Sequence, residues 1–213
     1  MRVGVLGSGV VGRVLAAGFL KHGHDVAVGT RSPEQLATWR KDHPKARVTS
    51  VADAAKGAEV VALAVKGSVA RDALAAAGNL DGKIVIDATN PIADAPPVKG
   101  VLSFFTKLDD SLMERLQREF PSARFVKAFS CVGNAHMVNP SFAGGPPTMF
   151  ICGNDPAAKK TVTGVLDQFG WETADMGGVE AARAIEPLCM LWCSPGLLHN
   201  QWSHAFKLLD RSR

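Results

Sequence analysis

The stretch RVGVLGSGVVG, residues 2–12, decides how this chain folds. It reads as a short apolar strand that runs into the pattern G-x-G-x-x-G and then into a helix. Gly7 allows the tight turn, Gly9 lets the backbone approach a pyrophosphate, and Gly12 lets the helix pack closely on the strand. The helix N-terminus directs free N–H groups and a partial positive charge at the phosphates. We therefore predict a dinucleotide-binding turn formed by Gly7, Ser8, Gly9, Val10, Val11 and Gly12.

The residues after the second expected strand, 25–28, indicate which dinucleotide fits. A site for NAD places an Asp or Glu about twenty residues beyond the glycines, where it holds the ribose 2′-hydroxyl. This chain has Thr30 and then Arg31 at that place. A carboxylate would repel a 2′-phosphate, whereas an arginine donates two charge-assisted hydrogen bonds to it. Thr30, Arg31 and Ser32 therefore favour NADP over NAD.

Ser32 has a second expected role. The order Ser32, Pro33, Gln35 is typical of a helix that begins with a capping box, with proline in the first turn. Capping and phosphate contact are compatible, because a helix N-terminus at this place is itself an anion site.

Strands and helices alternate through the first part of the chain. Residues 59–65 form a nearly continuous apolar run, which is typical of a parallel strand buried on both faces. Further strands are expected at 47–49, 83–87 and 124–128, with helical patterns between them. This alternation predicts an α/β fold with a doubly wound parallel sheet over residues 1–128. Residues 129–213 are expected to form a small C-terminal α/β domain with a helical tail.

Ligands of open α/β sheets bind beyond the carboxyl ends of the strands. Val65 and Lys66 end one buried strand, and Lys66 is expected either to contact a phosphate or to face solvent. Asn90 and Pro91 follow the next strand. Asn90 is placed to bind a nicotinamide carboxamide or its ribose, although Asn-Pro also starts turns. We expect the loop that follows the strand ending at Ala128 to line the same ligand-binding cleft.

The tail carries more apolar side chains than one small lobe usually needs. We expect a long helix to open after residues 175–178, to kink or stop at Pro187, and to break at Ser194-Pro195-Gly196. A final amphipathic helix is expected over residues 197–209. The excess of apolar surface predicts a homodimer interface.

The composition of the chain argues against several classes of function. The 213 residues include 24 Lys and Arg against 20 Asp and Glu, a net charge of +4, but the basic residues are dispersed. Dispersed basic residues argue against nucleic-acid binding. The four cysteines form no C-x-x-C pair, so neither a metal site nor a disulfide framework is expected. The apolar runs are too short for a membrane span, so we expect no membrane partner and a cytoplasmic location.

Several motifs together resemble those of the NADP oxidoreductases that use the deazaflavin coenzyme F-420. They lie at residues 5–9, 23–26, 29–31, 152–155, 175–178, 182–183 and 186–188. The chain also resembles the cytosolic reductase domain of membrane metalloreductases. Where the deazaflavin enzymes have a histidine-containing segment, this chain has Phe129-Ser130-Cys131.

The resemblance implies NADP(H) along the sheet edge, with a deazaflavin such as coenzyme F-420, or a flavin, stacked on the nicotinamide as acceptor. It implies that Val65, Asn90 and the loop after Ala128 lie near the nicotinamide. Hydride transfer between two ring systems needs little acid–base chemistry, so we assign no catalytic residue.

Two other functions stay open. One is an NADPH-dependent imine or carbonyl reductase with His136 or Ser130 as proton source. The other is a non-catalytic NADP sensor whose tail binds a partner. The chain has no tyrosine, which excludes Tyr-x-x-x-Lys chemistry.

Overall fold

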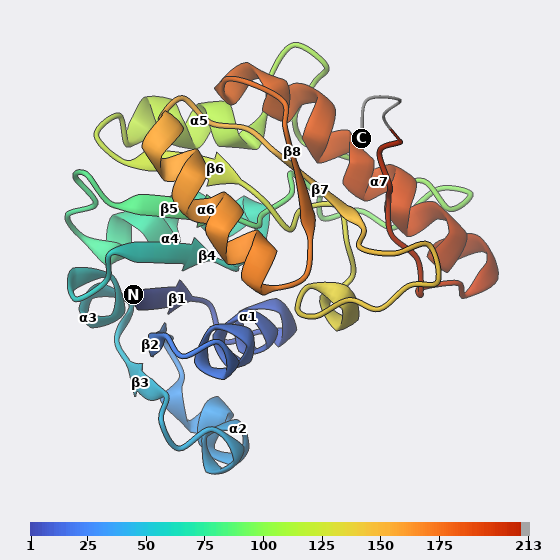
Figure 1. Cartoon of the computed structure of the whole chain (residues 1–213). Coiled ribbons are helices and arrows are strands. Elements are labelled where there is room, and N and C mark those ends of the chain that lie inside the picture. Colours follow the sequence, from blue (N-terminus) through green and yellow to red (C-terminus); the bar gives the residue numbers. More distant parts are fainter. Residues whose placement is uncertain (210–213) are drawn as a thin grey trace.

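The computed structural model describes residues 1–209 (Figure 1). The strands are β1 (Arg2–Leu6), β2 (Asp25–Gly29), β3 (Arg47–Thr49), β4 (Val60–Leu63), β5 (Ile84–Asp87), β6 (Arg124–Lys127), β7 (Thr148–Ile151) and β8 (Glu172–Asp175). The α-helices are α1 (Val10–Lys21), α2 (Ala37–Asp42), α3 (Val51–Lys56), α4 (Ala70–Ala77), α5 (Leu112–Glu119), α6 (Pro156–Gln168) and α7 (Ala182–His199). Short 3₁₀ helices are η1 (Pro33–Leu36), η2 (Gly67–Val69), η3 (Asn134–His136) and η4 (Val179–Ala181).

Six parallel strands form the main sheet in the order β3-β2-β1-β4-β5-β6. β1 lies at its centre, paired with β2 on one side and β4 on the other. The strand order reverses between β1 and β4, and this reversal is the position at which open α/β sheets bind their ligands. The predicted doubly wound fold is confirmed.

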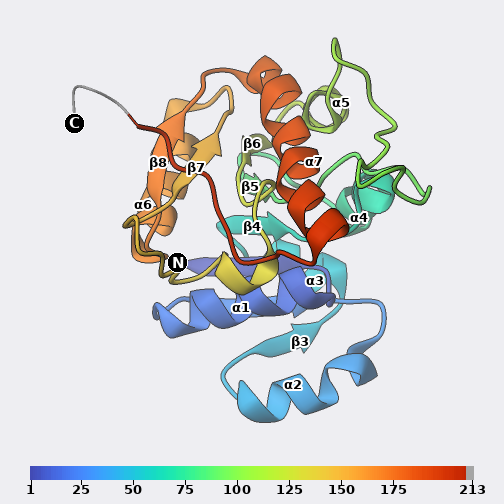
Figure 2. The same ribbon diagram turned by 90° about the vertical axis from the view of Figure 1, so that its right-hand side faces the viewer.

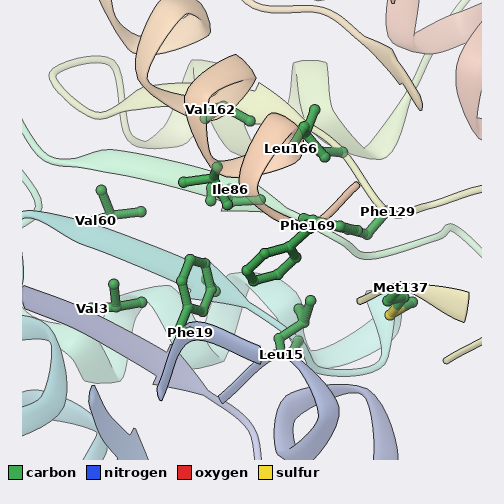
Figure 3. Close-up of a cluster of buried hydrophobic side chains, with 14 of the residues drawn as sticks. Val3, Leu15, Phe19, Val60, Ile86, Phe129, Met137, Val162, Leu166 and Phe169 are labelled. Atoms are coloured by element: carbon green, nitrogen blue, oxygen red, sulfur yellow. The ribbon is translucent and has the colours of Figure 1, made fainter. Parts of the chain in front are cut away.

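Two apolar cores cover the two faces of the sheet. On one face, α1 and α6 pack over side chains from β1, β4 and β5 (Figure 3). Phe19 of α1 and Phe169 just after α6 meet there, with ring centroids 5.1 Å apart. On the other face α3, α4 and α5 pack over the alternate side chains of the same strands. Burial on both faces explains why β4 is apolar at every position.

A small two-stranded parallel sheet, β7 and β8, extends the fold beyond β6. The N–H of Lys127 donates to the carbonyl of Cys152 at 3.0 Å, which joins the small sheet to the large one. Side chains of α6 share the core of α1 and β1. The division of the chain at residue 128 stays a prediction.

The expected break in α7 is wrong. α7 runs through both Pro187 and Pro195 to His199 and crosses the side of the molecule to which the strands of the main sheet point (Figures 1 and 2). An internal proline costs about 3 kcal/mol in a helix. Burial of Ile185, Cys189 and Trp192 offsets that cost. The helix ends instead at Asn200, which adopts a left-handed conformation with φ 54°.

The expected final helix over residues 197–209 is also wrong. Residues 201–209 form no helix, and Thr148 N–H donates to the carbonyl of Phe206 at 2.9 Å. Leu208 N–H donates to Thr148 Oγ1 at 3.0 Å. Bonds to the start of β7 therefore replace the helical bonds of this segment. Trp202 packs on Gly196 of α7, where a Cβ atom would overlap the indole ring.

The capping box at Ser32 is not formed. Residues 33–36 form the 3₁₀ helix η1, and the Ser32 side chain makes no capping bond. Ser32 N–H instead donates to Thr30 Oγ1 at 3.1 Å. By contrast, Ser50, Ser111 and Asp155 cap α3, α5 and α6, because the side chain of each accepts a backbone N–H in the first turn of its helix.

Among residues 1–209, no helix is both long enough and apolar enough to cross a membrane.

Candidate functional site

The glycine turn joins β1 to α1 as predicted. Gly7 has φ 123°, a conformation that L side chains rarely adopt, and a Cβ on Gly7 or Gly12 would overlap backbone atoms. Gly9 differs, because it is exposed and a Cβ there would meet no atom of residues 1–209 within 4 Å. The fold therefore requires Gly7 and Gly12 but leaves Gly9 free for another purpose. Within residues 1–209, no side-chain hydrogen bond from the cap residue closes the N-terminus of α1 and no acid lies in its first turn, so this N-terminus is open to an anion.

Thr30 connects the glycine turn to the end of β2. Its hydroxyl donates to Ser8 Oγ at 3.0 Å and accepts from the N–H of Ser32. Thr30 is buried, whereas Arg31 beside it is exposed. Arg31 is therefore held next to the glycine turn while its guanidinium remains free to meet a ligand.

A cavity of about 520 Å³ lies over the carboxyl ends of β1, β2 and β4. The predicted residues that line it are Gly7, Ser8, Gly9, Thr30, Arg31, Ser32, Val65 and Lys66. Gln35, Val51, Val69 and Asp72 also line it and were not predicted as site residues. Their signal is weak in the sequence, because Gln35 and Val69 lie in the 3₁₀ helices η1 and η2, whereas Val51 and Asp72 lie in α3 and α4. Each reaches the cavity only through the way its helix packs at the edge of the sheet.

A larger depression of about 670 Å³ lies between α1, the end of α2 and residues 138–139. It includes none of the predicted residues. We assign the site to the smaller cavity, since that one lies at the strand ends where the strand order reverses.

Six predicted residues lie outside the cavity. Val10 and Val11 are in the first turn of α1, and Gly12 is buried beneath Gly7. Asn90, Pro91 and Ala128 lie at the carboxyl ends of β5 and β6, away from the β2 side. The predicted site residues thus form two clusters, one at the carboxyl ends of β1, β2 and β4 and the other at the carboxyl ends of β5 and β6.

The second cluster contains two unsatisfied polar atoms. Asn90 Nδ2 donates to the carbonyl of Ser130 at 2.8 Å, which links the ends of β5 and β6. Among the described residues, Asn90 Oδ1 and Ser130 Oγ are buried and have no hydrogen-bond partner. A buried polar group without a partner is costly. These two atoms are therefore candidates for contact with a polar ligand.

The loop after Ala128 offers little acid–base chemistry. His136 lies in η3, half-buried, with its ring 4.9 Å from that of Phe142. Burial raises the pKa of the Cys131 thiol to about 12, so this thiol is protonated at neutral pH. Ser130 contacts Asn90 through its backbone carbonyl, which accepts from Asn90 Nδ2.

Sequence reasoning missed a buried ionic cluster next to Asn90. Lys127 at the end of β6 is fully buried and forms ion pairs with Asp87 at 2.7 Å and with Glu186 at 2.9 Å. Burial alone would lower the pKa of Lys127, but the two carboxylates outweigh it and hold that pKa above its ordinary range. The available signal was a lysine and an aspartate inside apolar strands, where unpaired charges are rare.

No group of three or more His, Cys, Asp or Glu side chains within residues 1–209 is arranged to hold a metal ion. The class of the protein follows from the fold and the glycine turn together. It is a Rossmann-type dinucleotide-binding protein, with its candidate site at the carboxyl ends of the parallel strands.

Comparison with known proteins identifies the family. The sequence profile described as "NADP oxidoreductase coenzyme F420-dependent" matches residues 2–91. A crystal structure from Arthrobacter sp. FB24, provisionally described as an F420-dependent NADP reductase, superposes with a TM-score of 0.92. It is 35% identical and the alignment covers 99% of this chain and 100% of that one. This chain belongs to the F420-dependent NADP oxidoreductase family, a family of NADP-dependent oxidoreductases.

Two curated relatives match over part of their length. Metalloreductase STEAP3 of Rattus norvegicus is 32% identical over 201 residues, which are 92% of this chain and 39% of that protein. The F420-dependent NADP reductase of Methanocaldococcus jannaschii is 33% identical over 116 residues, which are 53% of this chain and 50% of that protein. The chain thus spans about two-fifths of the metalloreductase. The resemblance to the deazaflavin family and to metalloreductases is confirmed.

Proposed function

We propose that this protein transfers a hydride between NADP(H) and a deazaflavin or flavin-like acceptor. The observation that carries the proposal is the cavity at the glycine turn, in which Thr30 and Arg31 occupy the place where an NAD site has a carboxylate. The relatives described as F420-dependent NADP reductases support the acceptor class.

The residues have distinct roles in this proposal. The first turn of α1 holds the pyrophosphate, and Arg31 with Thr30 and Ser32 holds the 2′-phosphate. Val65 and Lys66 lie beside the bound cofactor, while Asn90, Pro91 and the loop after Ala128 lie at its nicotinamide end. When bound, the nicotinamide supplies or accepts the hydride. The protein orients the ring and excludes water, so no acid or base of the chain is required.

The acceptor is tested by mixing the protein anaerobically with NADPH and an oxidised deazaflavin and following absorbance, with NADH and FMN as comparisons. The expected result is bleaching of the deazaflavin with NADPH and little with NADH. Tight NADPH binding without reduction of either ring would contradict the acceptor and favour a sensor.

The cofactor is tested separately by Arg31→Glu. This change places a carboxylate where the 2′-phosphate is proposed, so NADPH binding should weaken by about 30-fold or more while NADH binding changes little. Arg40→Glu is the matched control, because Arg40 is exposed and lies outside the cavity. Equal losses for NADPH and NADH would contradict the role of Arg31.

A second candidate is reduction of a small imine or carbonyl, favoured by the unpartnered hydroxyl of Ser130 at the β6 end. In this case Ser130 donates the proton. Consumption of NADPH with cyclic imines, lost in Ser130→Ala, would support it over the deazaflavin. We further propose a homodimer and a cytoplasmic location.

A further inference from the structure

The buried ionic cluster of Asp87, Lys127 and Glu186 lies next to Asn90, which we proposed to lie at the nicotinamide end of the cofactor. Its members come from three elements: Asp87 ends β5, Lys127 ends β6, and Glu186 lies on α7. All three side chains are almost completely buried. A buried ion triad is weak evidence for stability, because apolar residues of the same volume are often as good. Its placement here therefore calls for another explanation.

The cluster holds one residue, Thr89, at three points. Asp87 Oδ1 accepts from the Thr89 N–H at 2.9 Å and from the Thr89 hydroxyl at 2.6 Å. Lys127 Nζ donates to the Thr89 carbonyl at 2.9 Å. The backbone and side chain of Thr89 are thus both bonded to the Asp87–Lys127 pair.

Thr89 immediately precedes Asn90, whose position is constrained from two further directions. Gly67 packs on the Asn90 carbonyl so closely that a Cβ would overlap it. The Asn90 amide nitrogen donates to the Ser130 carbonyl, and Oδ1 has no partner within the described part of the chain. The unpartnered oxygen therefore has one orientation before any ligand arrives.

Glu186 connects this arrangement to α7. Its carboxylate accepts the N–H groups of Leu112 and Met113 at the start of α5, each at 3.0 Å, as well as the Lys127 ammonium. All three protons of Lys127 have an acceptor: Asp87, Thr89 and Glu186. The cation is fully engaged inside the protein, so it is not available to a ligand.

We propose that Lys127, Asp87 and Glu186 act as positioning residues, which fix Thr89 and thereby hold the Asn90 side-chain oxygen toward the nicotinamide of bound NADP(H). The inference rests on the proposed function, since it needs NADP(H) in the site. It differs from a purely structural role, because it requires the effect of the cluster on the cofactor to pass through Asn90.

Lys127→Met would leave two buried carboxylates without their cation and is expected to unfold the protein. The test therefore uses Thr89→Val, which removes the hydroxyl bond to Asp87 with little change of shape. Thr89→Ser keeps the hydroxyl and is the matched control. Asn90→Ala and the double variant Thr89→Val/Asn90→Ala complete a cycle that separates action through Asn90 from independent effects.

The readouts are the fluorescence spectrum of bound NADPH and its dissociation constant, with urea unfolding as a check of folding. The spectrum reports the surroundings of the nicotinamide without any acceptor. We expect Thr89→Val to shift the emission toward that of free NADPH and to weaken binding about 5-fold, Thr89→Ser to restore both, and Thr89→Val to have no further effect when Asn90 is alanine.

Three results would overturn the inference. The first is a folded Thr89→Val protein with the wild-type spectrum. The second is an effect of Thr89→Val that is the same whether residue 90 is asparagine or alanine. The third is a loss of NADPH binding in Thr89→Ser as large as that in Thr89→Val. In each case wild-type binding of NADPH leaves the proposed function intact. A wild-type protein that does not bind NADPH would overturn both proposals.

Discussion

At the residue scale, the three glycines of the turn, Gly7, Gly9 and Gly12, have different roles. Gly7 and Gly12 are required by the fold itself, because a Cβ at either position overlaps backbone. Gly9 has φ −68° and open space around it, so the fold of residues 1–209 gives no reason for glycine there. We propose that the reason is the ligand, since a Cβ at Gly9 would block the approach of a pyrophosphate.

Gly9→Ala therefore separates binding from folding. We expect the urea midpoint to stay within error of the wild type, because alanine readily adopts this backbone conformation. NADPH binding should weaken by about 10-fold or more. Gly57→Ala is the matched control: its Cβ also meets nothing within 4 Å, but Gly57 ends α3 outside the cavity. A Gly9→Ala protein that binds NADPH normally would show that the phosphates do not approach this turn.

The site residues that could be predicted from the sequence are those with a local signal. The glycine spacing and the order Thr30-Arg31 are readable because turn geometry and charge act over a few residues. Lys127 was missed, because its partners Asp87 and Glu186 are brought to it by three different elements. A pairing between residues 40 or more positions apart in the chain leaves no local pattern.

At the scale of elements, α7 is attached to α5 by an ion pair. Arg183 Nε donates to Glu114 Oε2 at 2.9 Å, and its Nη2 donates to Oε1 at 2.6 Å. Glu114 also accepts from the Ser111 hydroxyl at the start of α5. The hydrogen bonds from Arg183, aided by that of Ser111, outweigh burial and hold the pKa of Glu114 below its ordinary value of 4.5.

The lowered pKa of Glu114 gives a pH-dependent prediction. A carboxyl group whose pKa is lower in the folded protein stabilises it above the unfolded pKa, and this contribution is lost as pH falls through the folded pKa. Arg183→Gln should therefore lower the urea midpoint modestly at pH 7, and the difference from wild type should shrink as the pH falls below 4.5, the ordinary pKa of a glutamate, and through the lower folded pKa of Glu114. Arg40→Gln, which breaks no ion pair within residues 1–209, should show no such trend. A difference that is constant with pH would contradict the assignment to Glu114.

The elements themselves were predictable to different degrees. The buried parallel strand predicted from the apolar run at residues 59–65 depends on residues close in sequence, and β4 confirms it. The helices predicted for the tail were wrong because contacts with distant residues determine its structure. Pro195 and Gly196 read as a helix break, but Gly196 is where Trp202 packs on α7, and the following chain bonds to Thr148. Neither contact has a signature within the tail.

At the scale of the whole molecule, the apolar surface of α7 remains to be explained. Leu191 and Leu198 lie two helical turns apart on one side of α7, and both are more than half exposed. Leu197 and Trp202 are exposed nearby. Large contiguous apolar patches on a protein surface are typical of interaction sites. A second copy of this chain is the occupant that we proposed.

The dimer predicts a mass in solution of twice the 22.5 kDa of one chain. Leu191→Lys should shift the protein toward the monomer, because it places a charge in the centre of the buried contact. Leu108→Lys is the control, since Leu108 is also an exposed leucine, 88% accessible, but lies away from α7 in sequence and on no helix. Sedimentation velocity at several concentrations distinguishes the two states. A wild-type monomer at all concentrations would contradict the dimer, and equal dissociation by both substitutions would place the interface elsewhere. A dimer weakened by Leu191→Lys alone would assign the interface to α7, on the side of the molecule where the strands end and the proposed cofactor site lies.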